Sequence, residues 1–192
     1  MVNQSSDQYA LRIARELAEL GIPPTYGAER SLGLQPEATE LVTARVLKDG
    51  RELQLEPATA AAWAGLAAAA AHEQITLLLI SGFRSVTHQR GIIDRKLAAG
   101  QPLDEILRVN AAPGFSEHHT GQAVDIGTPG CPPLSEQFEQ TTAFQWLRCA
   151  AGRHGFRLSY PRDNPHGVIY EPWHWFHAEQ PVQYGSSPQE TR

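Results

Sequence analysis

The chain contains little of several residue types that would narrow its class. Of 192 residues only two are cysteines, and charged residues make up 19% with a formal net charge of −5. Two cysteines are too few for the disulfide framework of a small secreted domain, so we expect Cys131 and Cys149 to remain free thiols. A net negative charge does not attract the negatively charged phosphate backbone of a nucleic acid. We therefore expect no nucleic-acid partner.

Long apolar runs are also missing. The most apolar stretch, 75–80, has the length of a strand, whereas a helix that crosses a membrane needs about 20 apolar residues. The first 20 residues carry five charged side chains where an export signal would need an apolar core. We therefore expect no membrane span and a cytoplasmic location, or a periplasmic or cell-wall one if an export signal has been removed. The oligomeric state is left open.

What the chain does contain is an ordinary globular composition. Hydrophobic residues make up 41% of it, and the length suits one well-filled core better than two. No repeat or low-complexity linker divides it. We therefore expect a single domain over 1–192, in which 1–70 carries no recognisable motif and 77–177 carries all of them.

The first third of the chain predicts two helices around a hairpin. Apolar residues at helical spacing predict a helix over 7–20, with Ser5 and Ser6 as caps. Strands over 41–47 and 51–55 flank Asp49-Gly50, which is typical of a two-residue hairpin turn. Pro57 begins an alanine-rich helix that we expect to reach His72.

The remainder predicts an α+β fold. The apolar run 75–80 is typical of a strand buried on both faces. The pattern after it predicts three helices and two strands: helices over 86–99, 102–109 and 135–151, and strands over 156–160 and 168–177. The expected architecture is helices packed on a small, mainly antiparallel sheet.

Two separate segments of the sequence, 116–125 and 171–174, together suggest a metal centre. His118 and Asp125 lie in a single motif, and His174 follows about fifty residues later. A catalytic zinc ion commonly takes three protein ligands and leaves its fourth position to a water that it makes acidic. Gly121 is where a tight turn would return the chain between His118 and Asp125. Neighbouring side chains seldom both enter one site, so only one of His118 and His119 is expected to bind. We expect one zinc ion per chain.

Glu171 lies three residues before His174 and is the candidate base for that water. On a regular strand the two side chains would point to opposite faces. The chain must therefore bulge or twist near Pro172 for them to share a site. Regular strand pairing through 171–174 would contradict the shared site.

Arg84 follows the apolar strand at a location typical of binding residues. Its planar guanidinium suits a carboxylate or a peptide carbonyl. Ser85 can cap the next helix, and Gln89 lies one turn into it. Taken alone, this pattern is more typical of a surface arginine beside a capping serine.

Together these motifs resemble the VanY-type zinc D-alanyl-D-alanine carboxypeptidases of the lysostaphin, D-Ala-D-Ala and hedgehog (LAS) group of metallopeptidases. The similarity runs from about 77 to 177 and is carried by Ser81-Gly82-Phe83-Arg84-Ser85 with Gln89, Ser116-x-His118-x-x-Gly121-x-Ala123-x-Asp125, Gly155-Phe156-x-Leu158-Ser159-Tyr160-Pro161 and Glu171-Pro172-Trp173-His174-Trp175. The resemblance implies a LAS-type fold and zinc held by His118, Asp125 and His174. It also implies Glu171 as the catalytic base and Arg84 as a catalytic and substrate-binding residue, with Gln89, Ser116, Tyr160 and Trp173 completing the substrate site.

The resemblance implies peptides derived from peptidoglycan as substrates, and several functions stay open. Removal of D-alanine from tetrapeptides (LD) in cell-wall recycling fits a chain without an export signal, whereas removal from D-Ala-D-Ala ends (DD) is the alternative. A peptidoglycan endopeptidase would need an open groove, and Arg84 with Gln89 and Ser116 favours a closed end instead. A non-catalytic zinc-containing binding module would not need Glu171.

Overall fold

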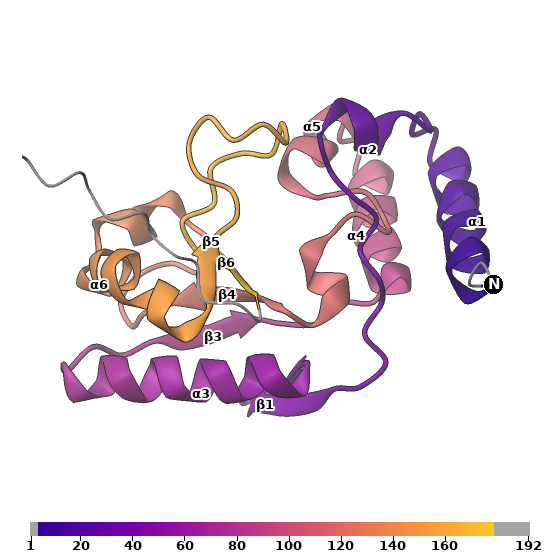
Figure 1. The fold of residues 1–192 in the computed structure, drawn as a ribbon. Helices are drawn as coiled ribbons and strands as arrows, with labels where there is room; N and C mark the ends of the chain where they lie inside the picture. Colours follow the sequence, from indigo (N-terminus) through magenta and orange to yellow (C-terminus); the bar gives the residue numbers. More distant parts are fainter. Residues whose placement is uncertain (1–3, 179–192) are drawn as a thin grey trace, which may run out of the picture.

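The computed structural model describes residues 4–178 and has the α+β architecture that the sequence predicts (Figure 1). Its main sheet has four antiparallel strands in the order β3-β4-β6-β5. The strands are β3 (Leu78–Ser81), β4 (Ala123–Gly127), β5 (Phe156–Leu158) and β6 (His174–His177). The two central strands, β4 and β6, carry two of the expected metal ligands, Asp125 and His174.

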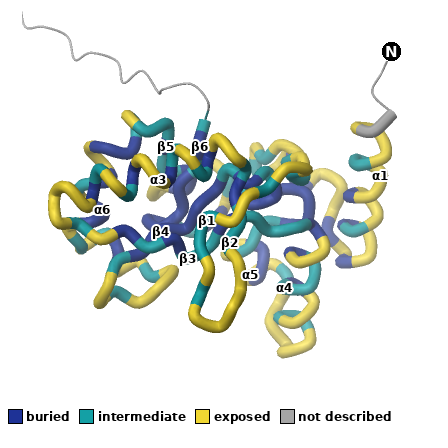
Figure 2. Tube along the Cα trace, turned by 90° about the horizontal axis from the view of Figure 1, so that it is seen from below, coloured by how far each residue is buried: buried dark blue, intermediate teal, exposed yellow. Residues whose placement is uncertain are grey.

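Alternation along β4 gives the sheet two different faces. Val124 and Ile126 belong to the larger apolar core, whereas Ala123 and Asp125 point to the opposite side. The core side is covered by α3 (Pro57–His72) and α6 (Thr142–Ala150), which contribute Leu66 and Leu147. Figure 2 shows β4 buried along its whole length. One face of β4 thus contributes side chains to the apolar core, and its other face carries Asp125 on the polar side of the sheet.

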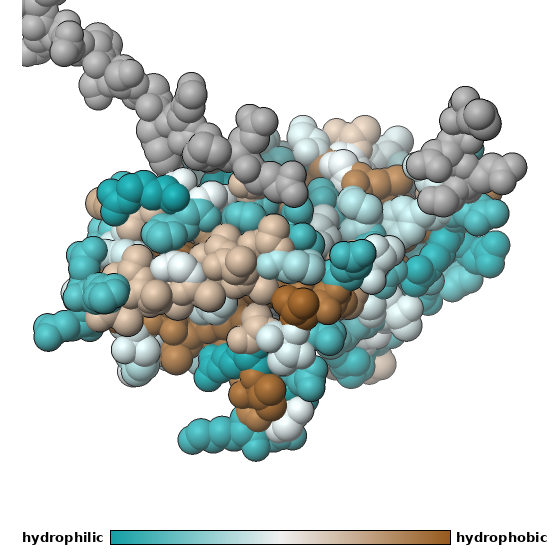
Figure 3. Space-filling model, turned by 60° about the horizontal axis from the view of Figure 1, so that its bottom comes forward, coloured by the Kyte–Doolittle hydropathy of each residue, from teal (hydrophilic) through white to brown (hydrophobic). Residues whose placement is uncertain are grey.

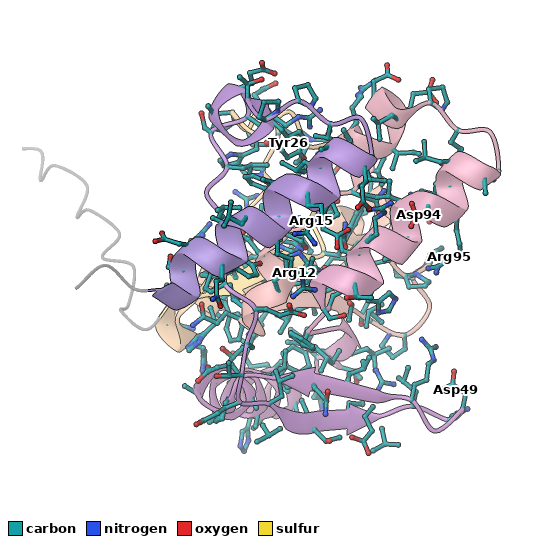
Figure 4. All side chains as sticks on the ribbon, turned by 90° about the vertical axis from the view of Figure 1, so that its right-hand side faces the viewer. Arg12, Arg15, Tyr26, Asp49, Asp94 and Arg95 are labelled. Carbon is teal, nitrogen blue, oxygen red and sulfur yellow. The ribbon has the colours of Figure 1, made fainter. Side chains whose placement is uncertain are left out.

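A second apolar cluster joins the helices on the other side of the molecule. It packs α1 (Gln4–Glu19), α2 (Tyr26–Glu29), α4 (Val86–Ala98) and α5 (Leu103–Val109) around Ile13, Ile93 and Ile106. Figure 4 shows α1 beside α4, with Arg12 at their contact, where its guanidinium donates to the Thr87 hydroxyl at 3.2 Å. Arg90 of α4 adds an ion pair with Glu16 at 2.8 Å. These contacts hold α4 in a fixed position next to the polar face of the sheet.

The hairpin of β1 (Val42–Val46) and β2 (Glu52–Leu55) forms as predicted, but its turn has three residues rather than two. The Leu47 N–H donates to the Arg51 carbonyl at 2.8 Å, and within 48–50 only Gly50 has a positive φ, 83°. A two-residue type I′ turn would need two such residues, so the longer turn forms. Figure 4 shows Asp49 at the tip, away from the body.

The hairpin covers the free edge of β3. The Phe83 N–H donates to the Gln54 carbonyl at 2.7 Å, and the Arg45 guanidinium donates to the Leu79 carbonyl at 2.6 Å. An exposed strand edge presents unpaired backbone N–H and C=O groups with which another chain can pair, and the hairpin blocks such pairing at β3. The edge position also corrects a prediction: β3 starts only at Leu78, and β4, not β3, is the strand buried on both faces.

Other predicted elements are shorter or broken. The helix expected over 135–151 is interrupted because Thr141 is extended and its hydroxyl accepts from the Phe144 N–H at 3.2 Å, which caps α6. The flanking pieces are 3₁₀ turns, Glu136–Gln140 and Ala151–His154. The strands expected over 156–160 and 168–177 shrink to β5 and β6. At the N-terminus the helix begins earlier than predicted, so Ser5 and Ser6 lie inside α1.

The alanine-rich helix α3 matches its predicted range and carries no lysine, arginine or carboxylate. Seen from below, its pale brown surface lies on the outside of the molecule (Figure 3). Both Cys131 and Cys149 are free thiols, as expected. Among the described residues, no helix combines the length and the apolar character that a bilayer crossing requires.

Candidate active site

A cavity of about 270 Å³ opens on the polar face of the sheet, between β4, β6 and the helical cluster. Its floor carries His118, Asp125 and His174, and its walls combine charged and apolar side chains. The wall residues are Arg84, Lys96, Val109, Asn110, Ala111, Ser116, Leu134, Tyr160, Val168, Ile169, Glu171 and Trp173. Residues far apart in the sequence, from 84 to 174, thus meet in one space.

The two central strands bring the three expected metal ligands together. Asp125 and His174 are directly paired across β4 and β6, and the Asp125 Oδ1 lies 3.1 Å from the His174 Nδ1. The Asp125 Oδ2 lies 3.3 Å from the His118 Nε2. All three ligand atoms lie within 4.8 Å of one another, and all three residues are buried. The predicted cluster is therefore present.

His118 is positioned by a 3₁₀ turn, Glu117–Thr120, which ends at Gly121. Gly121 has a φ of 71°, and a Cβ there would lie 2.9 Å from the Glu56 backbone nitrogen, so only glycine fits the turn. The His118 Nδ1–H donates to the Gly82 carbonyl at 2.7 Å. This bond directs the Nε2 toward Asp125.

His119 points away from the cavity, so only one of the two neighbouring histidines enters the site, as expected. Its Nδ1–H donates to the Arg84 carbonyl at 2.6 Å, and its Nε2 accepts from the Gly114 N–H at 3.1 Å. The Arg84 N–H in turn donates to the His118 carbonyl at 3.0 Å. Burial lowers the pKa of His119 to about 4, in keeping with a neutral ring. The histidine pair thereby anchors the backbone of Arg84 on both sides.

Glu171 reaches the site through a turn that precedes β6. The His174 N–H donates to the Glu171 carbonyl at 3.1 Å, and the Glu171 N–H donates to the Tyr160 carbonyl at 3.0 Å. The Glu171 carboxylate lies 3.9 Å from the His174 Nδ1. The predicted bend near Pro172 is confirmed, as a tight turn rather than a bulge within a strand. Burial raises the pKa of Glu171 to about 7.

The expected substrate residues occupy two positions relative to the cavity. Arg84, Ser116, Tyr160 and Trp173 line it. Gln89 does not: it is fully buried behind Arg84, where its Oε1 accepts from the Arg84 guanidinium at 2.9 Å and its amide donates to the Ala111 carbonyl at 2.7 Å. The structure thus places Gln89 as a support for Arg84, and a direct contact with substrate stays a prediction.

A model of the family VanY, D-alanyl-D-alanine carboxypeptidase, matches residues 52–180. The chain belongs to the VanY family. The match begins in β2 and includes every residue of the cavity floor.

Relatives of the chain are carboxypeptidases by name. It is 33% identical over 108 residues to a D-alanyl-D-alanine carboxypeptidase of Enterococcus faecalis, a match that spans 51% of this chain and 38% of that protein. Among solved structures it resembles the LD-carboxypeptidase LdcB at 30% identity and a TM-score of 0.66, covering 73% of this chain and 69% of LdcB. It also resembles VanY, a vancomycin-resistance D,D-pentapeptidase solved with Zn(II), at 27% identity and a TM-score of 0.58, covering 76% and 83%. The chain therefore spans well under half of the Enterococcus relative.

The donor set of this VanY-family member fits a zinc ion. Two imidazole nitrogens and one carboxylate oxygen converge, which is a common ligand set for catalytic zinc. The ring nitrogen of His118 that faces away from the cluster has a carbonyl acceptor, as metal-bound histidines usually do. The three residues could hold the ion and leave a coordination position open toward Glu171.

One largely buried carboxylate of the site, Glu117, was not predicted from the sequence. Its Oε2 lies 2.9 Å from the His174 Nε2, and its Oε1 accepts from the Arg157 guanidinium at 3.1 Å. The sequence did contain a signal, since Glu117 directly precedes the ligand His118. What it did not show is that the contact is with His174, 57 residues further along the chain.

His174 therefore lies between two carboxylates, which determines the charges of the metal-free site. Burial alone would lower the pKa of His174, but its hydrogen bonds to Asp125 and Glu117 raise it to about 10. Burial would likewise raise the pKa of Glu117, yet His174 lowers it to about 2, and His118 and His174 together lower that of Asp125. The imidazolium supplies positive charge where a metal would otherwise do so.

A second cation, Lys96, also lines the cavity and was not predicted. It lies on α4 one turn beyond Ile93, on the helix face that Gln89 shares. Burial lowers its pKa, and the nearby positive charge of Arg84 adds to that effect. Over residues 4–178 neither Arg84 nor Lys96 has a carboxylate within ion-pair distance. This part of the cavity consequently favours an anion.

Proposed function

We propose that the chain is a zinc-dependent carboxypeptidase that removes a C-terminal D-alanine from peptidoglycan stem peptides. The observation that carries the proposal is one cavity that combines the His118, Asp125 and His174 donors with the Glu171 carboxylate and the Arg84 guanidinium. Membership of the VanY family supports this reaction class. A bound zinc ion would make a water molecule acidic and polarise the scissile carbonyl.

The residues around the ion would perform the proton transfers and the orientation. Glu171 would receive the proton of the attacking water and return it to the leaving amine nitrogen. A carboxyl group whose pKa lies near 7 can accept and release a proton at neutral pH, and a nearby cation would favour its ionised form. Arg84 would stabilise negative charge on the carbonyl oxygen or on the terminal carboxylate.

The cavity suits a free C-terminus better than the middle of a peptide. Arg84 and Lys96 place two positive charges without a direct ion pair in the cavity, and Ser116 adds a hydroxyl. A terminal carboxylate would satisfy this charge, whereas an internal peptide bond would leave it unpaired in a partly buried space. This observation disfavours an endopeptidase. Glu171 beside the metal ligands disfavours a purely structural zinc site.

Among carboxypeptidases we propose the LD reaction on tetrapeptides first and the DD reaction as the alternative. The likeness to the LD-carboxypeptidase LdcB, at a TM-score of 0.66, supports the LD reaction, and the likeness to the D,D-pentapeptidase VanY, at a TM-score of 0.58, supports the DD alternative. The two reactions differ in the residue before the terminal D-alanine. Tyr160 and Trp173 form part of the wall that this residue would contact.

Mass spectrometry of the reaction products tests the proposal. The zinc-loaded protein is incubated separately with a muramyl tetrapeptide and a muramyl pentapeptide. Loss of one alanine from the tetrapeptide establishes the LD reaction, and loss from the pentapeptide alone establishes the DD reaction. Internal cleavage of either peptide, or no cleavage by protein shown to contain zinc, would overturn the carboxypeptidase proposal.

Two variants connect the reaction to the site. Glu171→Gln keeps the size of the side chain and removes the base, so cleavage should fall by at least 100-fold, a typical contribution of general-base catalysis. Glu40→Gln changes an exposed glutamate outside this cavity and should leave cleavage unchanged. Full activity in Glu171→Gln would refute the proposed base.

A further inference from the structure

Glu117 is a largely buried carboxylate that the proposed reaction does not use. Only 12% of its side chain is exposed, and it neither lines the cavity nor belongs to the ligand cluster. It lies behind His174, on the side of the ring that faces away from Asp125. Such a group is costly to bury unless its partners compensate for the lost water.

The two nitrogens of His174 have different surroundings. The Nδ1 faces Asp125 at 3.1 Å and the metal cluster, whereas the Nε2 faces Glu117 at 2.9 Å. A metal bound at the cluster would therefore take the Nδ1, and the Nε2 would keep its hydrogen and donate it to Glu117. Carboxylates placed in this way behind a metal-bound histidine fix the tautomer and the ring orientation, and they increase the basicity of the ligand.

Glu117 is itself held in place by a second contact. Arg157 of β5 donates to its Oε1 at 3.1 Å and to the Ser159 hydroxyl at 3.2 Å. The Arg157 guanidinium also lies 4.8 Å from the ring centre of Phe176 in β6. The neighbouring strands β5 and β6 thus hold the arginine, the arginine holds one oxygen of Glu117, and the other oxygen remains for His174.

We propose that Glu117 is a positioning residue that sets the zinc affinity of the site through His174. The inference rests on the proposed metal-dependent function, and it assigns to a residue outside the ligand set a measurable share of metal binding. A merely structural ion pair with Arg157 would not require the contact with the His174 Nε2. It would also leave zinc binding unchanged when the carboxylate is removed.

The test is zinc affinity, measured by competition with a chromogenic chelator, in Glu117→Ala and Glu117→Gln. Removal of such a supporting carboxylate typically weakens metal binding by roughly 10- to 100-fold, which is the loss expected for Glu117→Ala. Glu117→Gln can still accept a hydrogen bond but has no charge, so it should lose less. Glu139→Gln is the matched control, because Glu139 also pairs with an arginine, Arg162 at 2.8 Å, but contacts no ligand.

The outcomes separate this inference from the proposed function. Unchanged zinc affinity in both Glu117 variants would overturn the inference even if the wild-type protein cleaves peptides. Weakened binding in those variants alone would support it even if the wild-type protein cleaves none. If Glu117→Ala does not fold, as judged by circular dichroism, Glu117→Gln decides. The absorption spectrum of the cobalt-substituted protein adds a readout of ligand geometry, and it should change in the Glu117 variants but not in Glu139→Gln.

Discussion

Glu171 should destabilise the metal-free protein, and the size of the effect follows from its pKa. Burial raises that pKa from an ordinary 4.5 to about 7. The folded state therefore holds the proton more tightly than the unfolded state, and stability is lost as pH rises from about 4.5 through 7. At 1.36 kcal/mol per pH unit the loss reaches about 3 kcal/mol above pH 7. Glu171→Gln has no proton to lose and should avoid this cost.

The corresponding measurement is thermal unfolding of metal-free protein at pH 5 and pH 8. In a domain of this size 1 kcal/mol changes Tm by roughly 2–4 °C, so Glu171→Gln should raise Tm by roughly 6–12 °C at pH 8. At pH 5 the folded carboxyl is still protonated and the cost is only about 1 kcal/mol, so the gain should fall to roughly 2–4 °C. Zinc should shrink the gain at pH 8, because a neighbouring cation favours the ionised carboxylate.

An exposed glutamate provides the control for this prediction. Glu40→Gln should change Tm by less than about 1 °C at both pH values, since surface substitutions usually have small effects. The reasoning would be refuted if Glu171→Gln shifted Tm equally at pH 5 and pH 8. It would also be refuted if Glu171→Gln lowered Tm at pH 8 in the absence of metal, because Glu171 would then be a stabilising group.

Three further predictions concern the cavity. Arg84→Met should lower kcat/KM for a free tetrapeptide by roughly 100-fold or more, with little effect on a C-terminally amidated peptide; an equal loss on both would contradict the carboxylate contact. Lys96→Met should raise KM several-fold with kcat preserved. Lys48 is the only other lysine and is exposed, so Lys48→Met should have no effect in the same assay. Gly121→Ala, with its Cβ 2.9 Å from a backbone nitrogen, should cost roughly 1–3 kcal/mol in denaturant unfolding, and a neutral result would contradict the strained turn.

Local signals in the sequence predicted the helices well and the strands less well. Pro57 and Ser85 marked helix starts that the structure reproduces, because caps act within one turn of the chain. The helix over 135–151 failed at Thr141, where the hydroxyl caps a new helix instead of continuing the old one. Strand ends depend on partners far along the chain, so the run 75–80 did not reveal that β3 is an edge strand.

The metal ligands were predictable because they lie in short motifs with characteristic spacings. The residue that supports His174, Glu117, was not predictable in this way. His118 and Asp125 lie in one short motif, and Glu171 precedes His174 by three residues. The contact between Glu117 and His174, however, exists only because β4 and β6 pair in the observed register. At Pro172 the spacing predicted a departure from the regular strand, but not that it would be a tight turn.

The alternation along β4 implies that core packing and metal binding are mechanically linked. Val124 and Ile126 are fixed in the main core by Leu66 and Leu147, and Asp125 lies between them on the other face. Protein interiors are close-packed, so a cavity created under β4 is filled only partly by movement of its neighbours. A shift of Asp125 by a few tenths of an ångström would alter its contacts with both histidine ligands at once. Ile126→Ala should therefore weaken zinc binding as well as stability, although the Ile126 side chain lies on the opposite face of the strand from the ligands. Unchanged zinc affinity in a folded Ile126→Ala protein would show that the two faces of the strand are independent.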